Sequence, residues 1–283
     1  MAQRYQALLI AEFGQTLEVP YPAEFSDLLQ QSLFYFRRYF PTLFGISLVA
    51  GIIQVPAVLI AEEAGPVIST GEIVGLVVLS IPQYLALWLA QGAQIWVIGS
   101  AVVGRPVGFW DAWKAVLSRA FAYIATGLIA FLLAIPGLCL CGIGFLFTAA
   151  FFAVFIGQVV LLTGSSYFRA IAEHFHLVYQ SRWLTVVGYL LVTGVLLYAV
   201  YAILYPAIFA PQILYYILRE AIPVPLEWAS LFFSALWTQV TNAIVQSYFT
   251  VFLTLLFFDL KSRLEGLDLH LIAQRFDQWG SSA

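Results

Sequence analysis

Uncharged amides within apolar segments are the side chains whose types and spacing indicate chemistry in this sequence. They form two sets at helical spacing: Gln83, Gln91 and Gln94 in one segment, and Gln239, Asn242 and Gln246 in another. Side-chain amides in lipid seek partners, and each bond between helices contributes about 0.6–2 kcal/mol. Two interpretations follow. The amides join neighbouring helices, or they line a cavity for a neutral or zwitterionic solute or a lipid headgroup.

Titratable groups are missing from the same apolar segments. The segments are charge-free, contain no histidine, and comprise residues 39–61, 73–104, 120–168, 183–218 and 228–258. Proton relays, serine or aspartyl proteolysis and zinc sites all need such groups. Cys139 and Cys141 supply too few ligands for a structural zinc site. We therefore expect no catalytic residue, no metal and no cofactor, and a protein that is not an enzyme.

The composition explains which elements carry these residues. The chain has 283 residues, of which 62% are hydrophobic and 10% charged, with a mean hydropathy of +0.93. These values exclude a soluble globule, a disordered chain and a nucleic-acid-binding protein. A hydrocarbon core of about 30 Å needs about 20 helical residues, so each charge-free segment can cross a membrane. The segment 120–168, with 49 residues, is long enough to cross twice.

The distribution of basic residues predicts the topology. If residues 120–168 form a hairpin that turns near Pro136, eleven of the twelve Lys and Arg residues lie on one side and Arg219 lies on the other. This favours an all-α polytopic membrane protein with six transmembrane helices in three hairpins. Both termini are expected in the cytoplasm of a bacterium, with the protein in its inner membrane. The predicted crossings are about 42–61, 76–100, 120–136, 143–163, 184–205 and 230–258.

The predicted domain organisation follows from these crossings. Residues 1–23 form an N-terminal tail, 24–275 the membrane domain with its cytoplasmic exit segment 259–275, and 276–283 a C-terminal tail.

Amphipathic segments precede three of the crossings, at residues 25–36, 109–120 and 168–178. In the third, the predicted apolar stripe is Phe168, Ile171, Phe175 and Val178, and the opposite polar face is Arg169, Glu173, His176 and Gln180. Such segments typically lie as helices at the membrane surface. The alternative is that any cytoplasmic loop between membrane helices is amphipathic.

Charged residues at the cytoplasmic side form a candidate contact for lipids or a partner. They are Arg37, Arg38, Arg105, Arg169, Arg182, Asp259, Lys261, Arg263, Glu265 and Asp268. We expect Lys261 and Arg263 to meet lipid phosphates, and Glu265 and Asp268 to pair with basic residues of the surface helices. A metal or partner site in the exit segment is the alternative.

The exit segment also carries a family resemblance. Phe257-Phe258-Asp259-Leu260-Lys261, Arg263, Glu265-Gly266 and Asp268-Leu269 resemble the signature that closes bacterial proteins similar to the membrane domain of glycerophosphoryl diester phosphodiesterases, a largely uncharacterised group. The resemblance implies a multi-helix membrane domain with cytoplasmic ends. It does not imply the enzyme, because the catalytic barrel of about 250 residues has no counterpart in this sequence.

Two functions remain open from the sequence. The first is a non-enzymatic membrane module that acts as a scaffold or binds lipid or protein through its cytoplasmic helices. The second is a passive transporter or lipid-handling protein that uses an amide-lined region between the second and sixth crossings. The expected partners are membrane lipids, and either another protein or further copies of the chain, but no nucleic acid.

Overall fold

The computed structural model describes residues 24–63, 70–136, 154–180, 183–218 and 227–265, and these are mostly helical, without any strand. Four helices are long: α2 (Phe25–Glu63), α3 (Thr70–Val102), α9 (Trp183–Leu218) and α10 (Glu227–Glu265). The shorter elements are α4 (Phe109–Leu117), α5 (Ala120–Ala134), α7 (Ile156–Gln158), the π-helix η2 (Val159–Thr163) and α8 (Tyr167–Gln180).

Among the described residues, three helical stretches are long and apolar enough to cross a membrane. They are Ser80–Val102 in α3, Trp183–Leu204 in α9 and Ser234–Leu264 in α10. The helices α4 and α5 are bent by 68° relative to each other, and they would make a fourth stretch if the pair forms one span. The all-α prediction is confirmed for the described residues, as is the presence of several apolar membrane-length helices. Most of the predicted crossing at 143–163 lies outside the described part of the chain.

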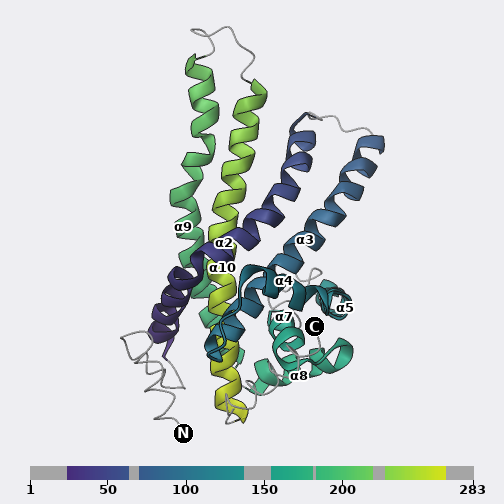
Figure 1. Ribbon diagram of the computed structural model, residues 1–283, viewed down its shortest axis with the longest axis vertical. Coiled ribbons are helices and arrows are strands. Elements are labelled where there is room, and N and C mark those ends of the chain that lie inside the picture. Colours follow the sequence, from purple (N-terminus) through teal and green to yellow (C-terminus); the bar gives the residue numbers. More distant parts are fainter. Residues whose placement is uncertain (1–23, 64–69, 137–153, 181–182, 219–226, 266–283) are drawn as a thin grey trace.

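The long helices are arranged as two pairs (Figure 1). α9 runs beside α10, α2 runs beside α3, and α2 also packs along α10. The short helices α4, α5, α7 and α8 gather at one end, against α3 and α10. The amphipathic segment at residues 25–36 is not a separate helix, because α2 continues through it into the apolar part of the chain. The other two amphipathic segments form the separate helices α4 and α8.

The buried core lies where α3 and α10 meet the short helices. Phe252, Phe257 and Phe258 of α10 are almost completely buried. α3 comes close to η2 because it has glycine at position 99, where an added Cβ would overlap the side chain of Leu162. Pro82 lies inside α3 without ending it. These contacts hold α10 as the central helix of the fold.

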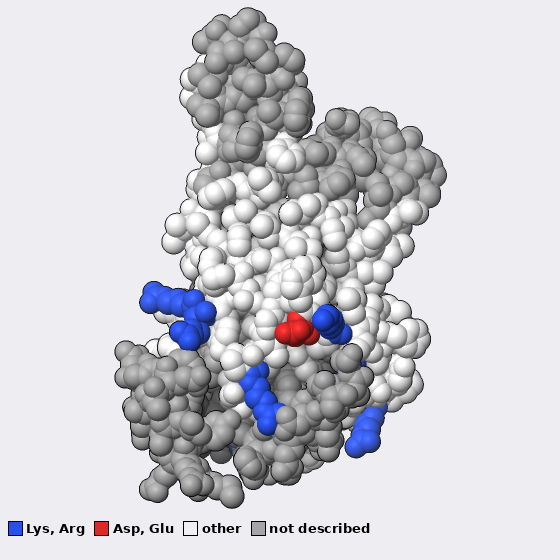
Figure 2. All heavy atoms as spheres, in the orientation of Figure 1, with Lys and Arg blue, Asp and Glu red and all other residues white. Residues whose placement is uncertain are grey.

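The charged side chains visible in Figure 2 lie towards the end of the molecule where the short helices gather. The described surface above them is free of charged side chains in this view. A sharp boundary between an apolar and a charged zone is typical of a protein that crosses a membrane.

Candidate functional site

Gln94 forms a polar contact between three long helices, which we call the Gln94 node (Gln94, Ser47 and Ser247, with the carbonyl of Leu43). The Nε2 of Gln94 donates to the Oγ of Ser47 on α2 at 2.6 Å and to the Oγ of Ser247 on α10 at 2.7 Å. The carbonyl oxygen of Leu43 lies 3.0 Å from the same nitrogen. Gln94 is fully buried, and its Oε1 has no hydrogen-bond partner among the described residues. Gln94 is therefore bonded to both α2 and α10.

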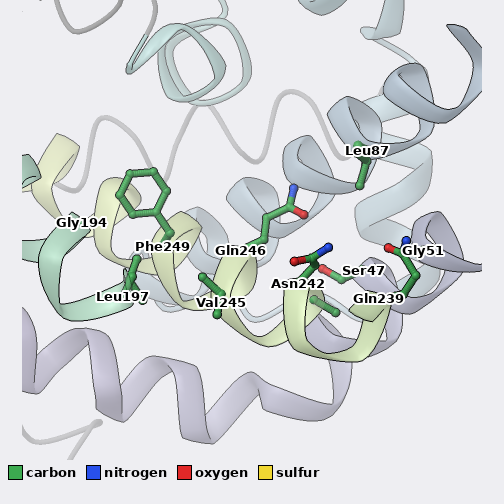
Figure 3. A pocket seen from close by; sticks show the side chains of 11 residues that line it. Ser47, Gly51, Leu87, Gly194, Leu197, Gln239, Asn242, Val245, Gln246 and Phe249 are labelled. Carbon is green, nitrogen blue, oxygen red and sulfur yellow. The ribbon is translucent and has the colours of Figure 1, made fainter. Parts of the chain in front are cut away.

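The three amides of α10 have a different environment, because they line a cleft of about 420 Å³ (Figure 3). Gln239, Asn242 and Gln246 extend from one face of α10. The opposing walls are formed by residues of α2, α3 and α9: Ser47, Gly51, Leu87, Gly194 and Leu197. Gln239 is buried, Gln246 half-buried and Asn242 exposed. The amide cleft thus offers uncharged donors and acceptors to a molecule that enters it.

Glycine makes room for the amide cleft on two sides. A Cβ on Gly51 would lie 3.2 Å from the Cβ of Gln239, so this glycine lets α2 approach the amide closely. A Cβ on Gly194 would meet nothing within 4 Å, so this glycine leaves the cleft open on the α9 side.

The other two predicted amides do not belong to the cleft. Gln83 and Gln91 are half-buried on α3, which contributes Leu87 to the cleft wall instead. The two predicted sets therefore do not bond to each other as sets. Gln94 reaches serines of α2 and α10 rather than the amides of α10.

A second, apolar cavity of about 270 Å³ adjoins the amide cleft, and both are lined by Leu197 and Val245. Its remaining walls come from α2, α9 and α10: Leu29, Leu33, Phe36, Thr193, Leu196, Val200, Ile244 and Tyr248. Thr193 is fully buried, and its Oγ1 makes no hydrogen bond within the described part of the chain. The two cavities together offer an amide-lined part and an aliphatic part to one elongated molecule.

α9 is a peripheral wall of both cavities. In the apolar stretch of α9, 11% of the residues are buried within the protein, compared with 72% in the apolar stretch of α10. The cleft is therefore separated from the surroundings by a helix that has few buried residues of its own.

The charged residues at the other end of α10 form a link to α8, which we call the Lys261 clasp (Lys261, Glu173, Ser165 and Thr163). The Nζ of Lys261 donates to the Oε1 of Glu173 at 2.6 Å. The Oε2 of Glu173 accepts from Ser165 Oγ at 2.6 Å and from Thr163 Oγ1 at 3.2 Å. Burial raises the pKa of Glu173, but the hydrogen bonds and the charge of Lys261 outweigh it, so the pKa lies below its ordinary value.

This clasp differs from the arrangement expected from the sequence. Lys261 points into the protein and is 8% exposed, so it binds an acid of α8 instead of lipid phosphate. The exit segment therefore pairs with α8, but the base is on α10 and the acid on α8, the reverse of the expected arrangement. Arg263 donates from Nε to Asp259 Oδ2 at 2.8 Å, and Asp259 is 1% exposed.

The remaining predicted contact residues are dispersed. Arg37, Arg38, Arg105 and Arg169 are exposed on different elements. Arg182 and Asp268 lie outside the described residues, as do Cys139 and Cys141, and the side chain of Glu265 is not described either. Within the described residues, no group of three His, Cys, Asp or Glu side chains is arranged to hold a metal ion.

Sequence reasoning missed Ser47, Ser247, Gly51 and Gly194 as parts of the node and the cleft. Ser247 directly follows Gln246, and Gly51 lies one helical turn after Ser47. These small residues were signals that α2, α9 and α10 approach each other closely at this level.

No protein-family model matches this chain, and no curated protein or solved structure is similar to it. The resemblance of the exit segment to the phosphodiesterase-associated membrane domains therefore stays a prediction.

Proposed function

We propose that this protein is a non-enzymatic membrane protein that holds a lipid-like amphiphile in the amide cleft and the adjoining apolar cavity. The observation that carries the proposal is that the two cavities are neighbours, with Leu197 and Val245 in the walls of both. Hydrogen-bonding amides on one side and aliphatic side chains on the other complement a molecule with a polar group and a hydrocarbon chain. Because Gln239, Asn242 and Gln246 carry no charge, the polar group is uncharged or zwitterionic.

The depth of the amides supports a ligand from the membrane itself. The rings of Phe36 on α2 and Tyr248 on α10 have centroids 5.6 Å apart, and the exposed Arg37 and Arg38 follow Phe36 directly. We take these arginines as the level of the membrane–water boundary. At about 1.5 Å per residue, Gln246, Asn242 and Gln239 lie about 3, 9 and 14 Å from Tyr248 along α10. The amides are then within the leaflet next to this boundary.

The topology that we propose for this function is the one predicted from the charges, with six crossings of a bacterial inner membrane and both termini in the cytoplasm. Its support is the position of the basic residues and the presence of several apolar membrane-length helices. Reporter fusions at Met1 and Ala283 test the topology. Reporters on opposite sides of the membrane would contradict it.

The binding proposal is tested by filling the cleft from its open side. Gly194→Leu places a side chain into the amide cleft. Gly188→Leu is the matched control, because Gly188 lies on the same helix outside the cleft and a Cβ on it also meets nothing within 4 Å. The measurement is the phosphatidylcholine retained by the purified protein after incubation with this lipid in detergent, read by native mass spectrometry. We expect Gly194→Leu to reduce retention at least fivefold and Gly188→Leu to leave it unchanged.

Equal retention by the two glycine variants and the unmodified protein would contradict the proposal. It would favour the other function predicted from the sequence, a scaffold whose interior binds nothing. A second pair of variants tests the polar part of the cleft. Asn242→Leu should weaken retention, whereas Gln91→Leu, a half-buried amide outside the cleft, should not.

A further inference from the structure

A threonine inside a helix often pairs its hydroxyl with the backbone of the preceding turn. Four threonines of this protein do so, each donating from Oγ1 to the carbonyl oxygen four residues earlier at 2.6–2.8 Å: Thr126, Thr163, Thr238 and Thr254. Thr193 of α9 differs from them. Its side chain is fully buried, and its Oγ1 makes no hydrogen bond to any described residue.

The burial of Thr193 is unusual for its helix. In the apolar stretch Trp183–Leu204 of α9, two residues are buried, Val186 and Thr193. A buried hydroxyl without a partner costs free energy, and a valine of the same shape would avoid this cost. One of the two buried positions therefore carries a cost that an acceptor from a bound molecule would remove.

Thr193 lies where the apolar cavity adjoins the amide cleft. It belongs to the wall of the apolar cavity, whose other lining residues are aliphatic or aromatic. The next residue, Gly194, borders the amide cleft, and Leu197, one helical turn after Thr193, is in the walls of both (Figure 3). Tyr248 has the other hydroxyl of the apolar cavity, but it is only half-buried. The fully buried donor is therefore at the junction between the polar and the aliphatic part.

The junction matches the chemistry of one class of lipid. In a diacyl phospholipid, ester carbonyls join the polar headgroup region to the hydrocarbon chains. These carbonyls are uncharged acceptors without a proton of their own, so they need a donor when they leave water. With the headgroup among the amides and a chain in the apolar cavity, an ester carbonyl comes to the level of Thr193. A lipid with ether linkages has nearly the same shape but lacks the carbonyl oxygens.

We propose that the ligand of the two cavities is an ester-linked diacyl lipid, and that the hydroxyl of Thr193 selects it by donating a hydrogen bond to an ester carbonyl. This inference rests on the proposed lipid-binding function and names the class of lipid. Thr193 is then a specificity-determining residue, because it separates two lipids that have the same headgroup and the same chains.

The experiment is a competition between dioleoyl phosphatidylcholine and its diether analogue. The purified full-length protein is incubated with an equimolar mixture of the two lipids in detergent, and native mass spectrometry measures how much of each is retained. The test variant is Thr193→Val, which keeps the shape of the side chain and removes its hydroxyl, and Thr193→Ser restores the hydroxyl. The matched control is Thr250→Val, because Thr250 is also fully buried without a described hydrogen bond of its Oγ1 but lines neither cavity.

We expect the unmodified protein to retain the diacyl lipid about fivefold or more over the diether lipid, because the diether leaves the hydroxyl of Thr193 unpaired. Thr193→Val should bring this ratio close to one by lowering diacyl retention alone. Thr193→Ser and Thr250→Val should keep the preference for the diacyl lipid. Unchanged retention of the diether lipid by Thr193→Val shows that the cavities of the variant are intact.

Equal retention of the two lipids by the unmodified protein would overturn the inference. A preference that persists in Thr193→Val, or a loss of both lipids in that variant, would also overturn it. The failure of the proposed function has a different result. If Gly194→Leu lowers the retention of both lipids but the unmodified protein does not distinguish them, lipid binding stands and the role of Thr193 is wrong. If neither lipid is retained, or Gly194→Leu changes nothing, lipid binding in the cleft is wrong and this inference fails with it.

Discussion

Substitutions in the Gln94 node are expected to show that losing the serines costs more stability than losing the glutamine. The Nε2 of Gln94 has two protons, which serve Ser47 and Ser247 at 2.6 and 2.7 Å. At about 0.6–1.7 kcal/mol for each bond between membrane helices, the two bonds contribute about 1–3 kcal/mol. The Oε1 of Gln94 is buried without a described partner, and such an atom costs about 1–3 kcal/mol.

Gln94→Leu removes both contributions together, so its free energy of unfolding should change by less than about 1 kcal/mol. The double variant Ser47→Ala, Ser247→Ala removes the two acceptors but leaves the buried amide in place. We expect it to lose about 2–3 kcal/mol, because the Leu43 carbonyl can accept from only one of the two Nε2 protons, and the other unpaired proton joins the unpaired Oε1. Adding Gln94→Leu to the double variant should recover most of this loss.

The assay is equilibrium unfolding by sodium dodecyl sulfate in mixed micelles, followed by circular dichroism. Gln91→Leu, on the same helix and outside the node, is the control and should change stability by less than about 0.5 kcal/mol. If Gln94→Leu were more destabilising than the double serine variant, the reasoning would be refuted. That outcome would mean that Oε1 is satisfied in the folded protein.

Three further predictions follow from the same structure. Lys261→Met should destabilise the fold by about 1–3 kcal/mol, because it leaves the partly buried carboxylate of Glu173 without its cation. The double variant Lys261→Met, Glu173→Gln should recover part of this loss. The same unfolding assay measures both. The clasp should contribute its full stability above the ordinary Glu173 pKa of 4.5 and lose it as the pH falls through the lower pKa of the folded state. A melting temperature of the unmodified protein that stays constant from pH 6 to pH 3, and equals that of Glu173→Gln throughout, would contradict this. Gly99→Ala should lower the melting temperature, because the added Cβ overlaps Leu162. Gly188→Ala should instead raise the stability by about 0.5–1 kcal/mol, because its Cβ meets open space and alanine favours the helix. Thermal unfolding in detergent measures both variants, and equal effects would argue against the close approach of α3 and η2.

The sequence was sufficient to predict an all-α protein with membrane-length helices, because missing charges over 20 or more residues allow few other structures. It was insufficient for the boundary between residues 25–36 and the crossing that follows. The charge-free segment begins at residue 39 and Pro41 follows, yet α2 continues through both, and Arg37 and Arg38 are good helix formers. The third amphipathic segment was predicted as a helix, and its residues form α8.

The roles of individual side chains were harder to predict, since they depend on what lies opposite. α8 has apolar residues over more than half of its circumference, so a single stripe drawn through Phe168 and Ile171 crosses from the exposed to the buried face. The six amides look alike in the sequence, yet Gln94 faces two serines and Asn242 faces an open cleft. Small residues on other helices decide between these environments, and pairing across the fold cannot be read from one sequence.

α10 connects the amide cleft, the Gln94 node and the Lys261 clasp, while α9 takes no part in the node or the clasp. The node fixes α10 to α2 and α3 through Ser247, and the clasp fixes it to α8 through Lys261. α9 contributes Gly194 and Leu197 to the cleft wall and has few buried residues in its apolar stretch. Because the polar bonds of the node and the clasp do not involve α9, a displacement of this helix from α10 would break neither of them. Entry of the proposed lipid beside α9 would therefore leave the node and the clasp intact.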